Sequence, residues 1–397
     1  MLVELHIIQN FAPSNLNRDD TGAPKDCEFG GVRRARISSQ CIKRAIREEF
    51  KQDSLLPDST RLLSPDELAD RTKILVSKVV DHLEEQGKDR EQAQAAVKAA
   101  LGGAGLSVKG EGRTEYLLFL GRTAIASLAD VCTEHWEVLT SQVQESEKKG
   151  GTKKKAAKAA VPREVGKAVR DILDGAYAAD LALFGRMLAD IPESNIDAAS
   201  QVAHAISTHK VAMEFDYFTA VDDLQPREKT GAGMVGTVVF NSACFYRYAN
   251  VDIDQLAKNL GGDQDLARRT IEAFLRASKD AIPTGKQNSF AAQNPPAFIL
   301  AVVRESGGPV SLANAFEKPV HTGRNEGLVE PSIEALDNYW AGFTSMYGTR
   351  GIKTIVASRA GDKPELRGLA SMDGFKVVPF EDLVSSVMEA IEFKEGT

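Results

Sequence analysis

Paired cysteines and long apolar runs are missing from this sequence. The four cysteines stand singly and form no CxxC pair, at Cys27, Cys41, Cys132 and Cys244. That spacing excludes a zinc ribbon and a thioredoxin-type redox motif, and it predicts reduced thiols. No apolar run approaches the ~20 residues that cross a bilayer. The start MLVELHIIQNF lacks the basic flank and cleavage site of a secretory signal. The sequence therefore predicts a cytoplasmic protein without a membrane partner.

Signatures of catalysis and of cofactor binding are also missing. The sequence has no HExxH zinc motif and no GxSxG nucleophile elbow. The pair Gly285 and Lys286 lacks the upstream glycine of a Walker A loop. The closest two histidines, His204 and His209, are five positions apart, which does not place two metal ligands on one helix face. We therefore expect a protein that is not an enzyme and that holds neither a cofactor nor a metal.

The charge of the chain is negative overall but unevenly distributed. The net charge is -7. Residues 29–47 nonetheless carry six cations and no acid, namely Arg33, Arg34, Arg36, Lys43, Arg44 and Arg47. Residues 148–158 carry six lysines and no acid, namely Lys148, Lys149, Lys153, Lys154, Lys155 and Lys158. Segregated positive charge of this kind is typical of proteins that bind a polyanion.

The N-terminal segment predicts a strand, a loop and a basic helix. In residues 2–9, apolar and polar side chains occupy opposite faces, which predicts a half-buried strand with Val3, Leu5 and Ile7 inward and Glu4 and His6 outward. A polar loop is expected over residues 13–36. Ser38 and Ser39 then offer an N-cap to a helix that ends near Phe50. At helical spacing its polar residues form one stripe that can follow phosphates, made of Gln40, Lys43, Arg44 and Arg47.

The rest of the chain changes from helical to strand periodicity. Helices are expected at 66–85, 89–101, 114–146 and 162–190. Two strands around 211–217 and 236–251 flank a turn-rich segment that contains Pro226. There follow a helix at 264–281, a strand at 297–304, a helix near 331–345, a strand near 352–358 and a helix near 380–393. Without the helical insertion the order is βαββαβ, the ferredoxin-like plan of RNA-recognition modules.

Three long stretches of this sequence resemble one known family. They are NLNRDDTGAPKDCEFGGVRRARISSQCIKRAIR at 15–47, VAHAISTHKVAMEFDYFTAVDDLQ at 202–225 with GTVVFNSACFYRYANVD at 236–252, and PTGKQNSFAAQNPP at 283–296. The motifs are specific and scattered over the whole chain. They resemble those of the CasC family, the backbone subunit of the type I-E CRISPR Cascade surveillance complex.

The resemblance implies an α+β fold shaped like a right hand. A ferredoxin-like (RRM-like) palm is expected at residues 1–60 and 241–397, a large helical fingers insertion at 61–200 and a β-hairpin thumb at 201–240. The implied function is to polymerise along a guide RNA, to present its bases for pairing and to interrupt pairing periodically with the thumb. The implied partners are CRISPR RNA, target DNA, further copies of the chain in a helical filament, other Cascade subunits and a recruited helicase–nuclease.

A guide RNA must be held by its backbone, because its bases have to stay free to pair. We therefore expect phosphate contacts from the basic helix, at Ser38, Gln40, Lys43, Arg44 and Arg47. The resemblance adds Arg18 and Lys25 in the loop before it. The loop PTGKQNSF offers four more polar side chains beside a glycine, at Lys286, Gln287, Asn288 and Ser289. An ordinary polar turn is the alternative for that loop.

Two further sites are expected on the thumb and on the lysine-rich segment. The resemblance implies that Phe218, Met234 and Val235 act as wedges against the bases, since a wedge must be apolar. Packing inside a small hairpin core is the alternative. The six lysines of residues 148–158 suit non-specific attraction to the target DNA duplex, or they serve as a solubilising linker.

Two other functions remain open from the sequence. Asp19, Asp20 and Asp26 follow the first strand, and in related type III backbone subunits an aspartate of this region cleaves RNA with a divalent metal. A metal-dependent ribonuclease is therefore the second hypothesis, although neighbouring cations favour ion pairing of these acids. A general single-strand-binding protein is the third, and it leaves the specific motifs unexplained.

Overall fold

The computed structural model describes most of the chain, in two compact units. The described residues are 1–110, 112–141, 161–175, 177–188, 191–220, 224, 234–323, 327–361 and 366–394. The sheet unit comprises Met1–Glu49, Ser200–Ile253 and Ile271–Lys394. The helical unit comprises Phe50–Ala199 and Asp254–Thr270. Helices and a large mixed sheet are both present, so the predicted α+β class is confirmed.

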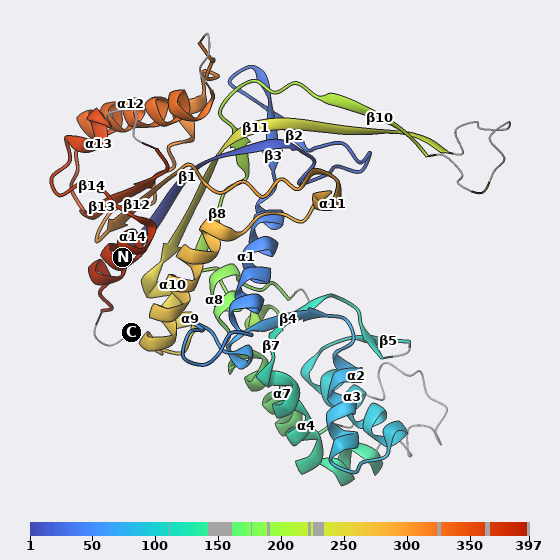
Figure 1. Ribbon diagram of the computed structural model, residues 1–397. Coiled ribbons are helices and arrows are strands. Elements are labelled where there is room, and N and C mark those ends of the chain that lie inside the picture. Colours follow the sequence, from blue (N-terminus) through green and yellow to red (C-terminus); the bar gives the residue numbers. More distant parts are fainter. Residues whose placement is uncertain are drawn as a thin grey trace. The chain divides into compact units, whose positions relative to one another are not determined.

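The sheet unit is built on one large sheet (Figure 1). Among the described residues its strands follow the order β14-β13-β12-β1-β11-β9-β3-β2, and β8 and β10 also pair with β11. Only β13 and β14 run parallel, and the other neighbours are antiparallel. The strands are β1 Leu2–Ser14, β2 Asp26–Phe29, β3 Val32–Ile37, β8 Ser200–Val202, β9 Ala205–Ser207, β10 Glu214–Ala220, β11 Met234–Asp252, β12 Phe298–Arg304, β13 Ile352–Arg359 and β14 Lys376–Val377.

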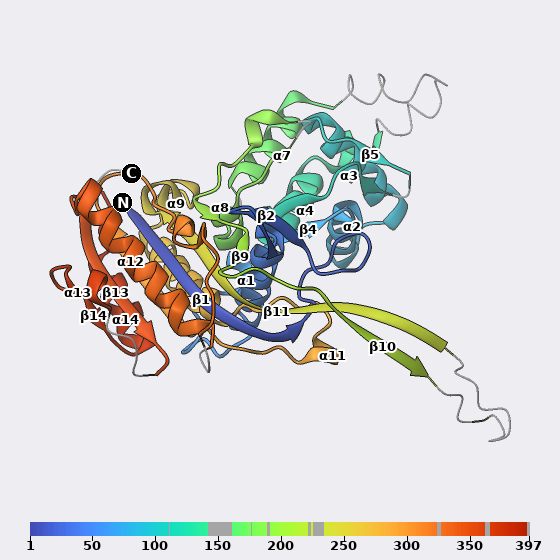
Figure 2. The ribbon, with the colours of Figure 1, turned by 90° about the horizontal axis from the view of Figure 1, so that it is seen from above.

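Strand β1 lies between β11 and β12 and is buried on both faces. The expectation of a half-buried strand is therefore wrong, since Glu4 and His6 are as inaccessible as Val3 and Leu5. The reason is that helices cover both faces of the sheet (Figures 1 and 2). On one face lie α1 (Ser39–Asp53), α10 (Gln264–Asp280) and α14 (Phe380–Ala390), and on the other α12 (Val329–Tyr347) and α13 (Arg367–Ala370).

The polar side chains on the buried β1 face bond to one another, and within the described chain only His6 Nε2 and Arg304 Nη2 of this group are left without a partner. Glu4 forms an ion pair with Arg304 and accepts hydrogen bonds from the Tyr248 hydroxyl, at 2.9 Å, and from a backbone N–H. The Nδ1 atom of His6 lies 2.9 Å from the Tyr246 hydroxyl. That hydroxyl also accepts the Leu312 N–H at 2.9 Å.

The burial of His6 predicts an acid-sensitive fold. Burial, assisted by the positive charge of Arg304, lowers the pKa of His6 from 6.5 to about 3. The unfolded chain therefore takes up a proton below pH 6.5 that the folded chain refuses until about pH 3, and stability falls by about 1.4 kcal/mol per pH unit in that window. Between pH 6.5 and 5, urea unfolding of His6→Gln is expected to lose about 2 kcal/mol less than the wild type. If the wild type, His6→Gln and the exposed control His321→Gln all lost the same free energy of unfolding, this role of His6 would be excluded.

The expected loop of residues 13–36 contains a hairpin, so that prediction is wrong in its second half. Strands β2 and β3 pair Asp26 with Ala35 and Phe29 with Val32. The turn between them is Gly30-Gly31, and both residues have positive φ, 61° and 72°. Two such glycines are typical of the two-residue turn that matches the twist of a hairpin.

The helical unit also contains short strands that periodicity did not reveal. Its helices are α2 Leu75–Glu85, α3 Arg90–Ala104, α4 Thr123–Glu134, α7 Arg163–Gly175, α8 Ala179–Phe184 and most of α9 Ile253–Asn259. The expected helices at 66–85 and 114–146 begin too early, because β4 (Ala69–Thr72) pairs with β7 (Leu118–Gly121), and β5 (Val108–Lys109) with β6 (Arg113–Thr114). Four apolar residues such as LFLG fit a buried strand or a buried helix equally well.

Strand β10 and the first part of β11 form a long hairpin that projects from the sheet unit (Figure 2). The strands expected around residues 211–217 and 236–251 are thus present, as are the predicted helices and strands after residue 264. A four-residue helix, α11 (Gln287–Phe290), lies within the loop before β12. In the described part of the chain, no helix combines the length and the apolar character needed to cross a membrane.

Candidate nucleic-acid interface

The start of the basic helix α1 is fixed by three polar side chains. The Ser38 hydroxyl accepts the Cys41 N–H at 3.3 Å, and Asn17 Oδ1 accepts the Ser38 N–H at 2.8 Å. The Ser39 N–H donates to Nδ1 of His204 at 3.2 Å. Ser38 is only 9% exposed, so its visible role is that of the expected cap. The sequence reasoning missed His204 as a site residue. Its ring accepts a hydrogen bond from a backbone N–H at the helix N-terminus, and that N–H was expected to face phosphate.

The predicted stripe on α1 is only partly available to a ligand. Gln40 and Arg44 are exposed, and Lys43 is half-buried. Arg47 is 7% exposed, although it lies at the same helical spacing. Lys43 and Arg47 both interact with other residues of the protein. The accessible part of the stripe is therefore its beginning, around Gln40 and Arg44.

The arginines of strand β3 have different environments. Arg33 is exposed and pairs with Asp26 at 3.0 Å. Arg34 has no exposed surface and donates to the carbonyl oxygens of Phe29, Ser207, Phe316 and Glu317. Burial lowers the pKa of Arg34. One cation of the basic segment thus serves the fold by joining β3 to the end of β9 and to the 3-10 turn at Phe316.

Cations from three elements converge beside the start of α1. Burial raises the pKa of Cys41, and the charges of Arg44 and Lys25 oppose that shift, which places both cations close to the thiol. Burial, then Arg36 and Lys25, lower the pKa of His204. We call Lys25, Arg36, Arg44 and His204 the basic cluster. In the described chain, no carboxylate lies within ion-pair distance of its lysine and arginines. Such cations are available to neutralise an external anion.

The edge of the basic cluster holds further polar groups. Lys25 and Arg36 border a shallow hollow at the end of β1, together with Ser14, Asn17 and Asn241. Arg18 is exposed and forms a β-bridge with Pro24, the residue before Lys25. The bridge therefore brings the backbone of Arg18 close to that of Lys25 in the sheet unit.

The loop PTGKQNSF is held against the end of β1. A Cβ atom on Gly285 would lie 2.2 Å from the carbonyl oxygen of Leu16, so only glycine permits this approach. Gln287 is used within the loop, since its Nε2 donates to the carbonyls of Pro283 and Ala292. Of the four predicted contacts, Lys286, Asn288 and Ser289 are exposed.

The β10–β11 hairpin has two different faces. Directly paired residues share a face, and Phe218 pairs with Gly236 while Thr219 pairs with Val235. One face therefore carries Phe218 and Met234 together with two acids, Glu214 and Asp216. The opposite face is uncharged and carries Phe215, Tyr217, Thr219, Val235, Thr237 and Val239. The three expected wedge residues are thus divided between the faces.

The uncharged face also presents large aromatic groups that the sequence reasoning did not single out. Phe215 is 69% exposed and Tyr217 is 66% exposed. Met234 and Val235 are exposed as well, and Phe218 lies over Gly236, where a Cβ atom would meet the ring at 2.5 Å. The alternation of apolar and acidic residues in MEFDYF already indicated that Phe215 and Tyr217 share one face of the strand.

Two of the three aspartates of the second hypothesis, Asp19 and Asp26, bond to neighbouring residues of the fold, whereas Asp20 is exposed. The Asp19 carboxylate accepts hydrogen bonds from Thr21 N, Thr21 Oγ1 and Ala23 N, and the hydroxyl bond above all lowers its pKa. Asp26 pairs with Arg33. Among the residues that the structure describes, no three His, Cys, Asp or Glu side chains are grouped to hold a metal ion.

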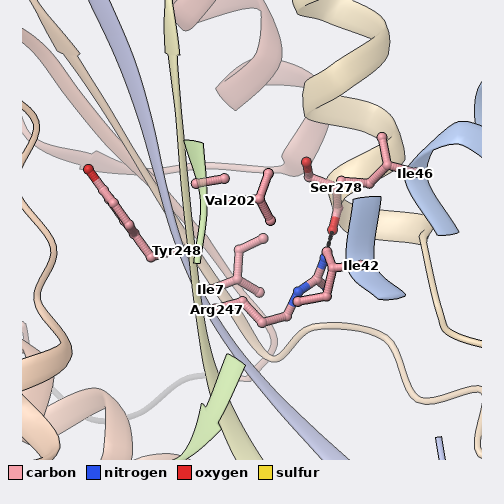
Figure 3. Close-up of a pocket in the computed structure, with 8 residues that line it drawn as sticks. Ile7, Ile42, Ile46, Val202, Arg247, Tyr248 and Ser278 are labelled. Carbon is pink, nitrogen blue, oxygen red and sulfur yellow. Dashed lines mark hydrogen bonds between the residues drawn. The ribbon is translucent and has the colours of Figure 1, made fainter. Parts of the chain in front are cut away.

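A pocket beneath α1 is lined mainly by apolar side chains (Figure 3). Ile7, Ile42, Ile46 and Val202 surround Arg247, whose guanidinium donates to the Ser278 carbonyl at 2.9 Å and to Gln9 Oε1 at 2.6 Å. Burial lowers the pKa of Arg247 to about 10. Tyr248 points to the other side of the sheet. Both donating groups of Arg247 face acceptors of the fold, so this pocket does not extend the basic cluster.

The lysine segment lies outside the described residues. Lys148, Lys149, Lys153, Lys154, Lys155 and Lys158 all fall within residues 142–160. Most of the turn between β10 and β11 falls outside as well.

Comparison with known proteins adds a family and a fold. The model of the family described as "CT1975-like protein" matches residues 3–385. A solved chain of a "CRISPR RNA-guided surveillance complex, pre-nicking" is 30% identical, with a TM-score of 0.82, and the match covers 98% of this chain and 100% of that one. A chain of another "CRISPR RNA-guided surveillance complex" is 26% identical, with a TM-score of 0.72 and the same coverage. No curated protein sequence matches.

Proposed function

The chain belongs to the family of CT1975-like proteins, and from this we propose that it is a guide-RNA-binding subunit of a CRISPR surveillance complex. Two solved chains of such complexes match it over nearly its whole length. The observation that carries the proposal is the basic cluster, in which Lys25, Arg36 and Arg44 converge without a carboxylate partner in the described chain. These groups suit a sugar-phosphate backbone and read no base.

We propose further that the subunit is a backbone piece of the CasC kind from a type I-E Cascade, repeated along the RNA. The order β12-β1-β11-β9 supports a ferredoxin-like palm, because two central antiparallel strands are flanked by one further strand on each side. The helical unit corresponds to the proposed fingers and the β10–β11 hairpin to the proposed thumb. Other Cascade subunits and a recruited helicase–nuclease are the remaining proposed partners.

The RNA path in this proposal runs along one side of the sheet unit. Arg18, Lys25, Gln40, Arg44 and Lys286 are its accessible polar contacts. Asn288 and Ser289 extend it toward the base of the hairpin, where Phe290 contacts Phe240 with ring centroids 5.6 Å apart. Ser38, Lys43, Arg47 and Gln287 then act mainly by holding the accessible groups in place.

The thumb is proposed to disrupt base stacking with an apolar face. The uncharged face of Tyr217 and Val235 suits this role better than the face of Phe218, because Glu214 and Asp216 on the latter repel phosphates. The lysines of residues 148–158 are proposed to attract the target DNA duplex. Neutralising all six should weaken duplex binding at low salt and leave RNA loading unchanged.

The proposal is tested by co-expressing the chain with its genomic neighbours and isolating the complex. We expect RNA of a fixed length to co-purify, since a filament of defined size protects a defined length. Incubation with Mg²⁺ should leave this RNA and a complementary RNA intact. Metal-dependent cleavage that is lost in Asp19→Asn would favour the ribonuclease instead. Equal affinity for RNA with and without a CRISPR repeat handle would favour a general single-strand binder.

A further inference from the structure

His204 occupies a defined place in the basic cluster. It lies between β8 and β9 and is exposed. Its Nδ1 atom is 3.2 Å from the Ser39 N–H at the start of α1 and 3.2 Å from Nη1 of Arg36. Two groups that only donate therefore meet at one ring nitrogen. The side chain is held by a helix end and by a guanidinium, which fixes the orientation of the ring.

These contacts assign the tautomer of His204. A backbone N–H and a guanidinium cannot accept a hydrogen bond, so Nδ1 must be the acceptor for both. The proton of the neutral ring then sits on Nε2. Within the described chain, Nε2 has no hydrogen-bond partner, and the side chain of His204 interacts only with Ser39, Arg36 and Lys25. An oriented N–H donor is thus left available at the surface.

The surroundings oppose a second proton on the ring. Protonation at Nδ1 would break the bonds from Ser39 and from Arg36. The charged groups that face His204 are Arg36 from β3 and Lys25 from the preceding loop, and both lower its pKa together with burial. Asp26, whose carbonyl oxygen accepts a hydrogen bond from Arg36, has its carboxylate paired with Arg33. Burial, Arg36 and Lys25 therefore all favour the neutral ring of His204.

We propose that His204 is a further RNA-backbone contact, a neutral donor that gives its Nε2–H to a phosphate oxygen held by Lys25, Arg36 and Arg44. This inference rests on the proposed function and adds a residue and a protonation state to it. A neutral donor contributes affinity without releasing counterions, so its effect differs in kind from that of the surrounding cations.

The test compares His204→Asn with Lys25→Gln in the full chain. Asparagine keeps an acceptor near the position of Nδ1 for Ser39 and Arg36 and removes the Nε2–H donor. The probe is a fluorescein-labelled single-stranded RNA of mixed sequence, followed by fluorescence anisotropy across a salt series at pH 6.5 and pH 8. His321→Asn, on an exposed histidine, is the matched control.

We expect His204→Asn to bind about tenfold more weakly at both pH values, the effect of one hydrogen bond to a charged group. The slope of log affinity against log salt should stay as in the wild type. Lys25→Gln should instead reduce the magnitude of that slope by about 0.7, the value for one phosphate on a single strand. Unchanged melting temperatures, with an affinity loss confined to position 204, would support a contact rather than a folding defect.

Three results would overturn the inference while leaving the proposed function intact. They are an unchanged affinity of His204→Asn, a reduced salt slope like that of Lys25→Gln, or a loss that grows as the pH falls. The latter two would make His204 a cation in the complex. If the wild type itself does not bind the RNA at any salt concentration, the proposed function fails, and the role of His204 fails with it.

Discussion

The double variant Lys25→Glu and Arg44→Glu is expected to lose RNA binding by about a hundredfold or more at physiological salt. Both cations are close to Cys41, and the described chain gives neither of them a carboxylate partner. Reversing these two charges therefore removes their attraction to the RNA phosphates and also adds repulsion. Neither residue has a side-chain hydrogen bond within the described chain, so the fold should be preserved.

Co-purification of RNA with the tagged subunit, and anisotropy with the purified chain, provide the measurement. The matched control is Arg163→Glu with Lys167→Glu, which reverses two exposed charges on α7 in the helical unit. This control should retain RNA at the wild-type level. Normal RNA retention by the Lys25 and Arg44 variant, with a normal melting curve, would show that the basic cluster is not the RNA site.

Replacing Arg304 by methionine is expected to destabilise the sheet unit by about 3–5 kcal/mol. The substitution leaves the Glu4 carboxylate at the centre of the sheet, with no exposed surface and without its cation. The Tyr248 hydroxyl and one backbone N–H still donate to it, which does not compensate a buried charge. The measurement is equilibrium unfolding in urea at pH 7.

The second arm of this experiment adds Glu4→Gln to Arg304→Met. Glutamine keeps an acceptor for Tyr248 and removes the charge, so most of the lost stability should return, even though one polar group remains buried. A double variant as unstable as Arg304→Met alone would mean that packing, rather than the uncompensated carboxylate, is responsible. Comparing the single and the double variants separates these two explanations, because Glu4 and Arg304 contact each other directly.

The elements that local sequence determines were predicted well. The helix from Ser39, the buried strand β12 and the helix from Gln264 lie within one or two residues of their expected starts. Capping serines, apolar runs and helical periodicity act over a few positions, and a single sequence displays them directly. The Gly30-Gly31 hairpin was missed, although paired glycines carry a turn signal, because its strands are only four and six residues long.

The environment of each cation could not be predicted in the same way. Arg34 looks like its neighbours in sequence, yet its acceptors Ser207 and Phe316 are 173 and 282 positions away. Arg47 shares the helical stripe of Gln40 but is buried. Charge patterning singles out the basic segment, whereas only long-range pairing decides which of its cations reach solvent. His204 was missed for the same reason, since its partners Arg36 and Ser39 are brought to it by the sheet.

Strand β11 has a mechanical consequence. It runs for 19 residues, about 60 Å at ~3.3 Å per residue, and its first part is one side of the projecting hairpin while its later part pairs along β1. One continuous strand therefore joins the described part of the hairpin to the interior of the sheet. The only irregularity in its pairing with β1 lies between Phe11 and Ser14, opposite Ala243 and Asn241. Bending of the β10–β11 hairpin relative to the rest of the sheet unit would concentrate at this irregularity.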